Sequence, residues 1–247
     1  MDIAGRSHKG FIRVSNQDNY LITQNSQGDT LAIVCDGIGG AKAGDVASLM
    51  ATKFIGESFA SIEGFDSITD GEAWFKEAIK KANDKIFTAT ATSDDYAGMG
   101  TTLVGALIVK NEIIVANVGD SRAYVLYKDV LRQVTLDHSL VYELLASGKI
   151  SVADLDTHPQ RNILTNALGV VGQLKIDTFK VTEGEKLLLC TDGLSGYVSS
   201  EVILSIINNL DYTIDTMLEE LIIKANDAGG YDNTTIIIAD IGGLMDE

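Results

Sequence analysis

The stretch LAIVCDGIGGAKAGD, residues 31–45, decides how the rest of the chain is interpreted. Its apolar run from Leu31 to Cys35 is typical of a buried strand, and the run ends at Asp36. Glycines follow, and they let the backbone approach a ligand more closely than a residue with a side chain would allow. The stretch therefore predicts a carboxylate at a strand end, beside a loop that can surround a ligand. The glycines are Gly37, Gly39, Gly40 and Gly44.

Two later segments repeat this arrangement. In KLLLCTDGLSG (186–196) an apolar strand leads to Asp192, and in GGYDNTT (229–235) Asp232 precedes the apolar run 236–239. Each Asp-containing loop, taken singly, is ordinary turn chemistry. Three strand-linked carboxylates together predict one polyanionic centre. Because clustered carboxylates repel one another, we expect hard cations that prefer oxygen ligands, Mn²⁺ or Mg²⁺, to neutralise them.

Composition sets the limits of the interpretation. With 247 residues, 45% of them hydrophobic, one proline and no low-complexity tract, the chain predicts a single domain spanning residues 1–247. Its net charge of −16 argues against an extended nucleic-acid surface. The longest apolar run, 103–109, is too short to span a membrane, and we expect a soluble, cytoplasmic monomer. Cys35 and Cys190 lie in apolar segments, which favours reduced core residues over a disulfide.

Residue patterns along the chain indicate antiparallel sheets covered by helices. Thr69 and Glu72 have the spacing of a capping box, and 101–134 is typical of an antiparallel meander. The polar segment 150–169 is interpreted as a surface flap. Strands are expected in 11–24, as a pair joined by 15–18, and at 174–181, 186–191 and 234–240; helices are expected at 44–60, 69–90, 139–147, 200–208 and 213–226.

Three further polar residues each permit two interpretations. Arg13 is either an ordinary surface arginine or, beside a metal cluster, a planar fork suited to two phosphate oxygens. Asp18 either caps a turn or joins the acidic cluster. Asp120, within Gly119-Asp120-Ser121-Arg122, interrupts an apolar pattern and by itself indicates a turn.

The assembled motifs resemble the type-2C metal-dependent serine/threonine protein phosphatases, in their compact bacterial single-domain form. They occur in family order over nearly the whole chain, which makes the resemblance specific. The motifs are RVSNQD (13–18), VCDGIGGAKAGDVAS (34–48), GMGTTL (98–103), ANVGDSRAY (116–124), LDHSLVYELLASGKI (136–150), HPQRNILTNALG (158–169), LCTDGLS (189–195) and GGYDNTT (229–235).

The resemblance implies an α-β-β-α sandwich with metals at one sheet edge. It implies that Asp36 bridges two Mn²⁺ or Mg²⁺ ions and that the carbonyl of Gly37 binds one of them. It assigns Asp120 to a weaker third ion, shared with Asp192. The remaining implied roles are metal ligands for Asp192 and Asp232, phosphate binding for Arg13, and ordering of metal-bound water for Asp18.

The chain departs from the family pattern at two places. Gln17 stands where many relatives have an acidic residue that helps the second ion. Ile38 and Ala41 occupy positions where relatives can carry a histidine proposed as general acid. None of the three histidines, His8, His138 and His158, can be assigned that role from the sequence.

The implied reaction is hydrolysis of phosphoserine and phosphothreonine in proteins by a water or hydroxide that bridges two metals. The expected partners are phosphorylated proteins, a serine/threonine kinase and its substrates. The alternative is a catalytically weak pseudophosphatase that uses the same fold to bind a phosphoprotein. Retention of four strand-linked aspartates argues against this alternative.

Overall fold

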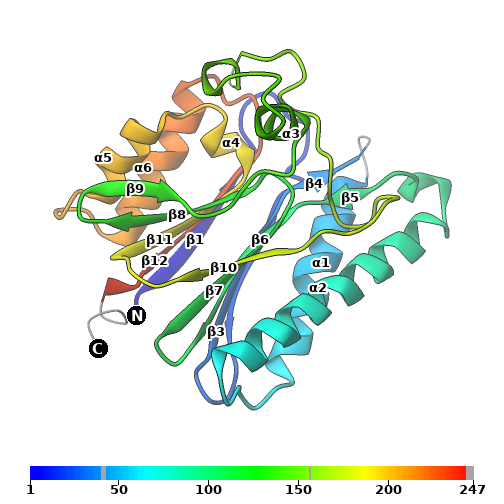
Figure 1. Cartoon of the computed structure of the whole chain (residues 1–247), viewed down its shortest axis with the longest axis horizontal. Helices are drawn as coiled ribbons and strands as arrows, with labels where there is room; N and C mark the ends of the chain where they lie inside the picture. The colour runs from blue at the N-terminus through cyan, green and yellow to red at the C-terminus, as the bar shows by residue number, and fades with distance from the viewer. Residues whose placement is uncertain (40–42, 156, 243–247) are drawn as a thin grey trace.

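The computed structural model describes residues 1–39, 43–155 and 157–242. Two five-stranded sheets lie face to face, and all of their strand pairs are antiparallel (Figure 1). The first sheet has the order β1 (Ile3–His8), β12 (Thr234–Asp240), β11 (Lys186–Cys190), β8 (Arg122–Tyr127), β9 (Val130–Gln133). The second has the order β10 (Asp177–Val181), β7 (Glu112–Val118), β6 (Leu103–Val109), β3 (Thr30–Cys35), β2 (Asn19–Gln24). A short pair, β4 (Gly37–Ile38) and β5 (Gly100–Thr101), extends beyond the end of β3.

Helices cover the outer faces of both sheets. The helices α1 (Gly44–Ala60) and α2 (Ile68–Thr90) cover the second sheet, and α5 (Ser200–Ile207) and α6 (Ile214–Asp227) cover the first (Figure 1). The predicted α-β-β-α sandwich is therefore confirmed. Shorter helical segments are α3 (Leu140–Ala146), α4 (Asp192–Ser195), η1 (Asp94–Tyr96) and η2 (Val152–Asp154). Among the described residues, no helix combines the length and apolar composition needed to cross a membrane.

The core follows the alternation of side chains along the strands. On β11, Leu187 and Leu189 belong to the apolar cluster between the two sheets, whereas Leu188 and Cys190 belong to the cluster under α5 and α6. Successive side chains of a strand point to opposite faces, so β11 is buried on both sides. Cys35 and Cys190 are buried and free, as predicted. This fixed layering holds the strand ends that carry the acidic residues.

Of the predicted N-terminal strand pair, the second strand is confirmed as β2 (Asn19–Gln24), and the first, expected before 15–18, is wrong. The strands are β1 and β2, and residues 11–18 between them form no strand. The sequence IAGRSH of β1 has weak apolar alternation because its residues are only half buried at the sheet edge. The strand is held by its pairing with β12, which comes from the other end of the chain. The residues around β1 in the sequence therefore do not reveal that it forms a strand.

The expected meander at 101–134 is also corrected. The strands β6 and β7 pair, and β8 and β9 pair, but β7 and β8 belong to different sheets. The chain changes sheets at Gly119, whose φ of 105° lies in the left-handed region. The turn that carries Asp120 is therefore the point where the chain passes from one sheet to the other.

The N-cap of α2 lies two residues earlier than the predicted capping box. Ser67 is the N-cap, and its hydroxyl accepts a hydrogen bond from the backbone N–H of Asp70 at 3.2 Å. Glu72 instead accepts hydrogen bonds from Lys76 and Thr178. Both serine and threonine suit an N-cap, so the sequence alone did not separate the two registers.

Candidate active site

Asp36 is presented at the end of β3, whose six residues are all buried. Its backbone N–H donates to Thr102 Oγ1 at 3.0 Å, and its carbonyl accepts from Thr101 Oγ1 at 2.9 Å. The next residue is restricted to glycine, because a Cβ on Gly37 would lie 2.1 Å from the carbonyl oxygen of Gly44. The start of α1 therefore packs directly on the loop after Asp36.

Asp192 and Asp232 come from neighbouring strands of the first sheet. Asp192 follows β11 and begins α4, while Asp232 lies just before β12. The two loops touch backbone to backbone, since a Cβ on Gly193 would lie 1.8 Å from the carbonyl oxygen of Asn233. Asn233 in turn accepts a hydrogen bond from the backbone N–H of Gln17 at 2.8 Å. The sequence analysis did not single out Asn233, although its place after Asp232 in GGYDNTT was a signal.

Asp120 is the fourth aspartate of the acidic group and lies in the turn where the chain passes from one sheet to the other. The adjacent Ser121 Oγ lies 2.7 Å from Thr102 Oγ1, the same hydroxyl that accepts from the N–H of Asp36. One threonine side chain therefore connects the turn of Asp120 to the strand end of Asp36. Sequence reasoning also missed this role of Thr102, because a threonine in a strand has no distinguishing pattern.

These residues meet in one cavity of about 220 Å³ at the edge where the two sheets face each other. Of the residues predicted for the site, Asp18 alone is not in its lining; it is buried and accepts a hydrogen bond from Thr191 Oγ1 at 2.9 Å. Ile38 and Gln17 line the cavity, and Ala41 lies outside the described residues. The lining residues are Arg13, Gln17, Asp36, Gly37, Ile38, Gly39, Asp120, Asn162, Leu164, Asp192, Asp232 and Asn233.

The carboxylates are held at a high electrostatic cost. Burial, followed by the charges of Asp18 and Asp192, raises the pKa of Asp36 well above its ordinary value. Burial and then the charge of Asp192 do the same to the pKa of Asp120. Burial raises the pKa of Asp18 to about 7, against hydrogen bonds that lower it. Such a group favours either protons or a bound cation.

The donor set fits a hard divalent cation. The ligands present are carboxylate and carbonyl oxygens, which Mn²⁺ and Mg²⁺ prefer. The buried oxygens Asp18 Oδ1 and Asp192 Oδ1 have no hydrogen-bond partner among the described residues. The side chains do not yet surround one point: within the described residues, no three acidic, histidine or cysteine side chains form a ready ligand group. Asp232 is paired with a cationic side chain.

Arg13 forms an ion pair with Asp232. Its Nη2 donates to Asp232 Oδ2 at 2.6 Å, and its Nε lies 3.4 Å from the carbonyl oxygen of Tyr231. The Arg13 side chain is 51% exposed, so it pairs with Asp232 at the mouth of the cavity. A residue predicted to bind phosphate therefore supplies the counter-charge to a residue predicted to bind metal.

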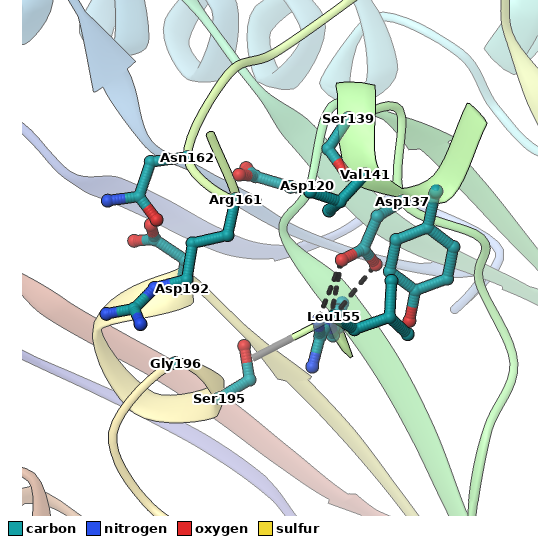
Figure 2. Close-up of a pocket in the computed structure, with 12 residues that line it drawn as sticks. Asp120, Asp137, Ser139, Val141, Leu155, Arg161, Asn162, Asp192, Ser195 and Gly196 are labelled. Atoms are coloured by element: carbon teal, nitrogen blue, oxygen red, sulfur yellow. Dashed lines mark hydrogen bonds and ion pairs between the residues drawn. The ribbon is translucent and has the colours of Figure 1, made fainter. Parts of the chain in front are cut away.

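The flap, residues 150–169, borders the same acidic group. A second cavity of about 150 Å³ is lined by Asp120 and Asp192 from the sheets and by Arg161 and Asn162 from the flap (Figure 2). Arg122 and Asp137 also line this cavity, and Arg122 donates to Asp137 at 2.8 to 3.0 Å. His158 stays within the flap, where its Nδ1 accepts from the N–H of Gln160. The flap therefore forms part of the wall of a cavity that begins at the acidic group.

Comparison with known proteins agrees with this geometry. The sequence model of the family described as protein phosphatase 2C matches residues 4–228. The chain belongs to the protein phosphatase 2C family. It is 40% identical to the serine/threonine phosphatase stp of Listeria monocytogenes, over 95% of this chain and 94% of the relative. It is 35% identical to the protein phosphatase PhpP of Streptococcus pneumoniae, over 96% of both chains.

The fold comparison gives the same result. The crystal structure of the serine/threonine phosphatase Stp1 from Staphylococcus aureus superposes with a TM-score of 0.91 at 34% identity, covering 97% of this chain and 94% of that one. The chain is accordingly a serine/threonine protein phosphatase. Phosphatases of this family are metal-dependent and generally use Mn²⁺ or Mg²⁺.

Proposed function

We propose that the chain, as one catalytic domain of residues 1–247, hydrolyses phosphoserine and phosphothreonine in proteins with two core Mn²⁺ or Mg²⁺ ions and a weaker third. The observation that carries the proposal is the convergence of four strand-end carboxylates on one cavity beside Arg13. The proposed metal ligands are Asp36, the carbonyl of Gly37, Asp192 and Asp232 for the core ions, and Asp120 with Asp192 for the third.

The ions, when bound, would activate a water as nucleophile and offset the charge that accumulates on the phosphate. Asp36 and Asp192 are fixed by the strand ends, so they provide negative charge at constant positions. Asp18 is buried outside the cavity lining, and its unpartnered oxygen Oδ1 is the group to which we assign the ordering of metal-bound water. We assign the role of nucleophile to water and no covalent role to these side chains.

Arg13 is assigned to the phosphate. Its guanidinium is a rigid fork that matches two phosphate oxygens, and it reaches the cavity from the exposed segment 11–18. A divalent cation at Asp232 would replace Arg13 as the counter-charge of that carboxylate. Binding of cation would then release the guanidinium for the substrate.

Phosphorylated proteins, including those made by a serine/threonine kinase, are the proposed substrates. The relatives named above are phosphatases of the same class, which supports this assignment. The chain carries a net charge of −16, so the few cationic side chains around the cavity become the places where a phosphate is attracted.

The test is hydrolysis of an aryl phosphate and of a phosphoserine peptide, with Mn²⁺ and after chelation. Activity that requires Mn²⁺ supports the proposal, whereas a folded protein inactive in both conditions supports a phosphoprotein-binding pseudophosphatase. Asp192→Asn removes one ligand charge at nearly constant shape and is expected to reduce turnover to background. Turnover equal to the unsubstituted protein would refute the assignment of the core ions.

A further inference from the structure

His138 is a buried histidine that the mechanism above does not use. Its imidazole is 5% exposed and lies against the turn that carries Asp120. Its Nδ1 faces the backbone N–H of Gly119 at 3.1 Å, and its Nε2 lies 3.0 Å from Asp177 Oδ2. The amide Nδ2 of Asn166 is also 2.8 Å from Nδ1. The ring therefore connects three separate segments of the chain.

These contacts determine which nitrogen carries the proton. A backbone N–H can only donate, so Nδ1 facing Gly119 must offer its lone pair. The proton is then on Nε2, which donates it to the Asp177 carboxylate. Burial opposes ionisation of Asp177, but hydrogen bonds from Lys175 and His138 hold its pKa below the ordinary value. Asp177 thus remains an acceptor and orients the ring toward Gly119.

Gly119 is held on both sides, through the two peptide groups that it joins. Its N–H donates to the ring, and its carbonyl accepts from the backbone N–H of His138 at 2.9 Å and from Asn117 Nδ2 at 3.2 Å. Gly119 has a φ of 105°, and a Cβ there would lie 2.6 Å from Thr102 Cγ2. Asp120 follows directly, so the direction of its carboxylate depends on both peptide groups: the ring of His138 holds the one before Gly119, and the backbone N–H of His138 holds the one after it.

The same residue fixes the end of the flap. The carbonyl of His138 accepts from the N–H of Thr165 at 2.9 Å, and Asn166 bridges the ring to the carbonyl of Lys175 at 2.8 Å. The neighbouring Ser139 pairs with Leu164, which lines the acidic cavity. A displacement of the ring would therefore disturb both the turn of Asp120 and the segment through which the flap returns to the fold.

We propose that His138, oriented by Asp177, is a positioning residue. It holds the backbone of Gly119 and thereby fixes the position of Asp120 relative to Asp192 and to the end of the flap. The inference rests on the proposed function for the role of Asp120. It predicts that loss of the Nδ1 acceptor affects the outer part of the site and leaves phosphate binding at Arg13 unchanged.

Two substitutions separate the two nitrogens of the ring. In His138→Asn the side-chain carbonyl occupies the place of Nδ1, so the acceptor for Gly119 is kept and the contact with Asp177 is lost. In His138→Gln the amide reaches toward Asp177, and no acceptor remains at the Nδ1 position. His138→Ala removes both. The kinetic readouts are phosphopeptide turnover, the Mn²⁺ concentration for half-maximal turnover, and inhibition by inorganic phosphate.

Removing such a supporting group typically changes metal affinity or activity by 10- to 100-fold. We therefore expect about tenfold lower turnover or weaker Mn²⁺ response in His138→Ala and His138→Gln, with His138→Asn within about threefold of the unsubstituted protein and phosphate inhibition constant in all three. Equal activity per folded molecule in His138→Ala would overturn the proposal. The proposal would also be overturned if the activities of the three variants followed their melting temperatures and not the presence of an acceptor at the Nδ1 position.

A second readout needs no metal and no activity. The ¹⁵N signals of the histidine rings in the metal-free protein report the tautomer, and with only three histidines His138 is assigned by its absence in His138→Gln. The proposal requires a neutral Nε2–H tautomer, and Asp177→Asn is expected to shift it. An Nδ1–H tautomer would contradict the proposal even if the enzyme is active. If the unsubstituted enzyme lacks Mn²⁺-dependent activity, the proposed function fails. The tautomer is measured independently of activity, and an Nε2–H tautomer would then support only the hydrogen-bond arrangement around His138.

Discussion

Replacement of Asp18 by asparagine should make the metal-free protein more stable at neutral pH. Asp18 is buried, its Oδ1 has no hydrogen-bond partner among the described residues, and burial raises its pKa from 3.8 to about 7. Asparagine keeps the shape and can still accept from Thr191, but it has no charge to bury. The change therefore removes an unfavourable charge without opening a cavity.

The sign and the pH range follow from the same values. A carboxyl group whose pKa is raised in the folded state binds its proton more tightly there, so its contribution to stability is complete below pH 3.8 and is lost as the pH rises toward 7. The interval from 3.8 to about 7 corresponds to roughly 4 kcal/mol. Asp18→Asn should recover on the order of 4 kcal/mol at pH 8, and less than half of that at pH 5.

Thermal unfolding in EDTA measures this difference. For a chain of this size each kcal/mol moves the melting temperature by about 2 to 4 °C, so we expect an increase on the order of 10 °C at pH 8. Asp66→Asn is the matched control, because Asp66 is exposed and its removal changes the net charge by the same amount. A melting temperature lowered at pH 8, or an increase of the same size at pH 5 and pH 8, would refute the reasoning. Saturating Mn²⁺ should reduce the difference, since bound cations stabilise the charged form.

Three other substitutions test separate parts of the site. Arg13→Lys keeps the charge and loses the fork, so inhibition by inorganic phosphate should weaken about tenfold while the Mn²⁺ dependence stays constant; a selective loss of Mn²⁺ affinity would contradict this. Asp120→Ala should slow phosphopeptide turnover and leave the inner ions bound in a crystal grown with Mn²⁺; full activity without an outer ion would argue for a simple turn residue. Gly193→Ala should lower expression and melting temperature sharply, because its Cβ would lie 1.8 Å from Asn233 O; a stable, active variant would show that these loops can separate.

The parts of the fold that could be predicted carry their own local signals. The helix α1 matches the expected range 44–60 because glycine residues mark its start and apolar residues recur along one face. The strand β12 matches 234–240 because an apolar run follows a polar loop. The strand β1 and the separation of β7 from β8 could not be predicted in this way. Both depend on which distant strand is the partner, and that information is not local.

The same distinction applies to the site. The position of Asp36, Asp192 and Asp232 at strand ends followed from alternation of apolar and glycine-rich segments, and the cavity that gathers them agrees with that prediction of a shared centre. The pairing of Arg13 with Asp232 and the burial of Asp18 did not follow. The first depends on the contact of residues 11–18 with the loop before β12, and Asp18 contacts Thr191 at the end of β11. Electrostatic roles within a cluster are therefore assigned only once the packing is known.

The packing also indicates which arginine near the cluster is available to a phosphate. Arg122 donates through Nε and Nη2 to Asp137 and through Nη1 to the hydroxyl of Tyr124, and its side chain is 23% exposed. Breaking such a largely buried pair typically costs about 3 to 5 kcal/mol, because it leaves a buried carboxylate uncompensated. Arg13 has one short contact with Asp232 at an exposed position, a kind of pair worth about 0 to 1 kcal/mol. A phosphate competes for Arg13 at little cost, whereas Arg122 stays fixed and keeps the wall beside Asp120 in place.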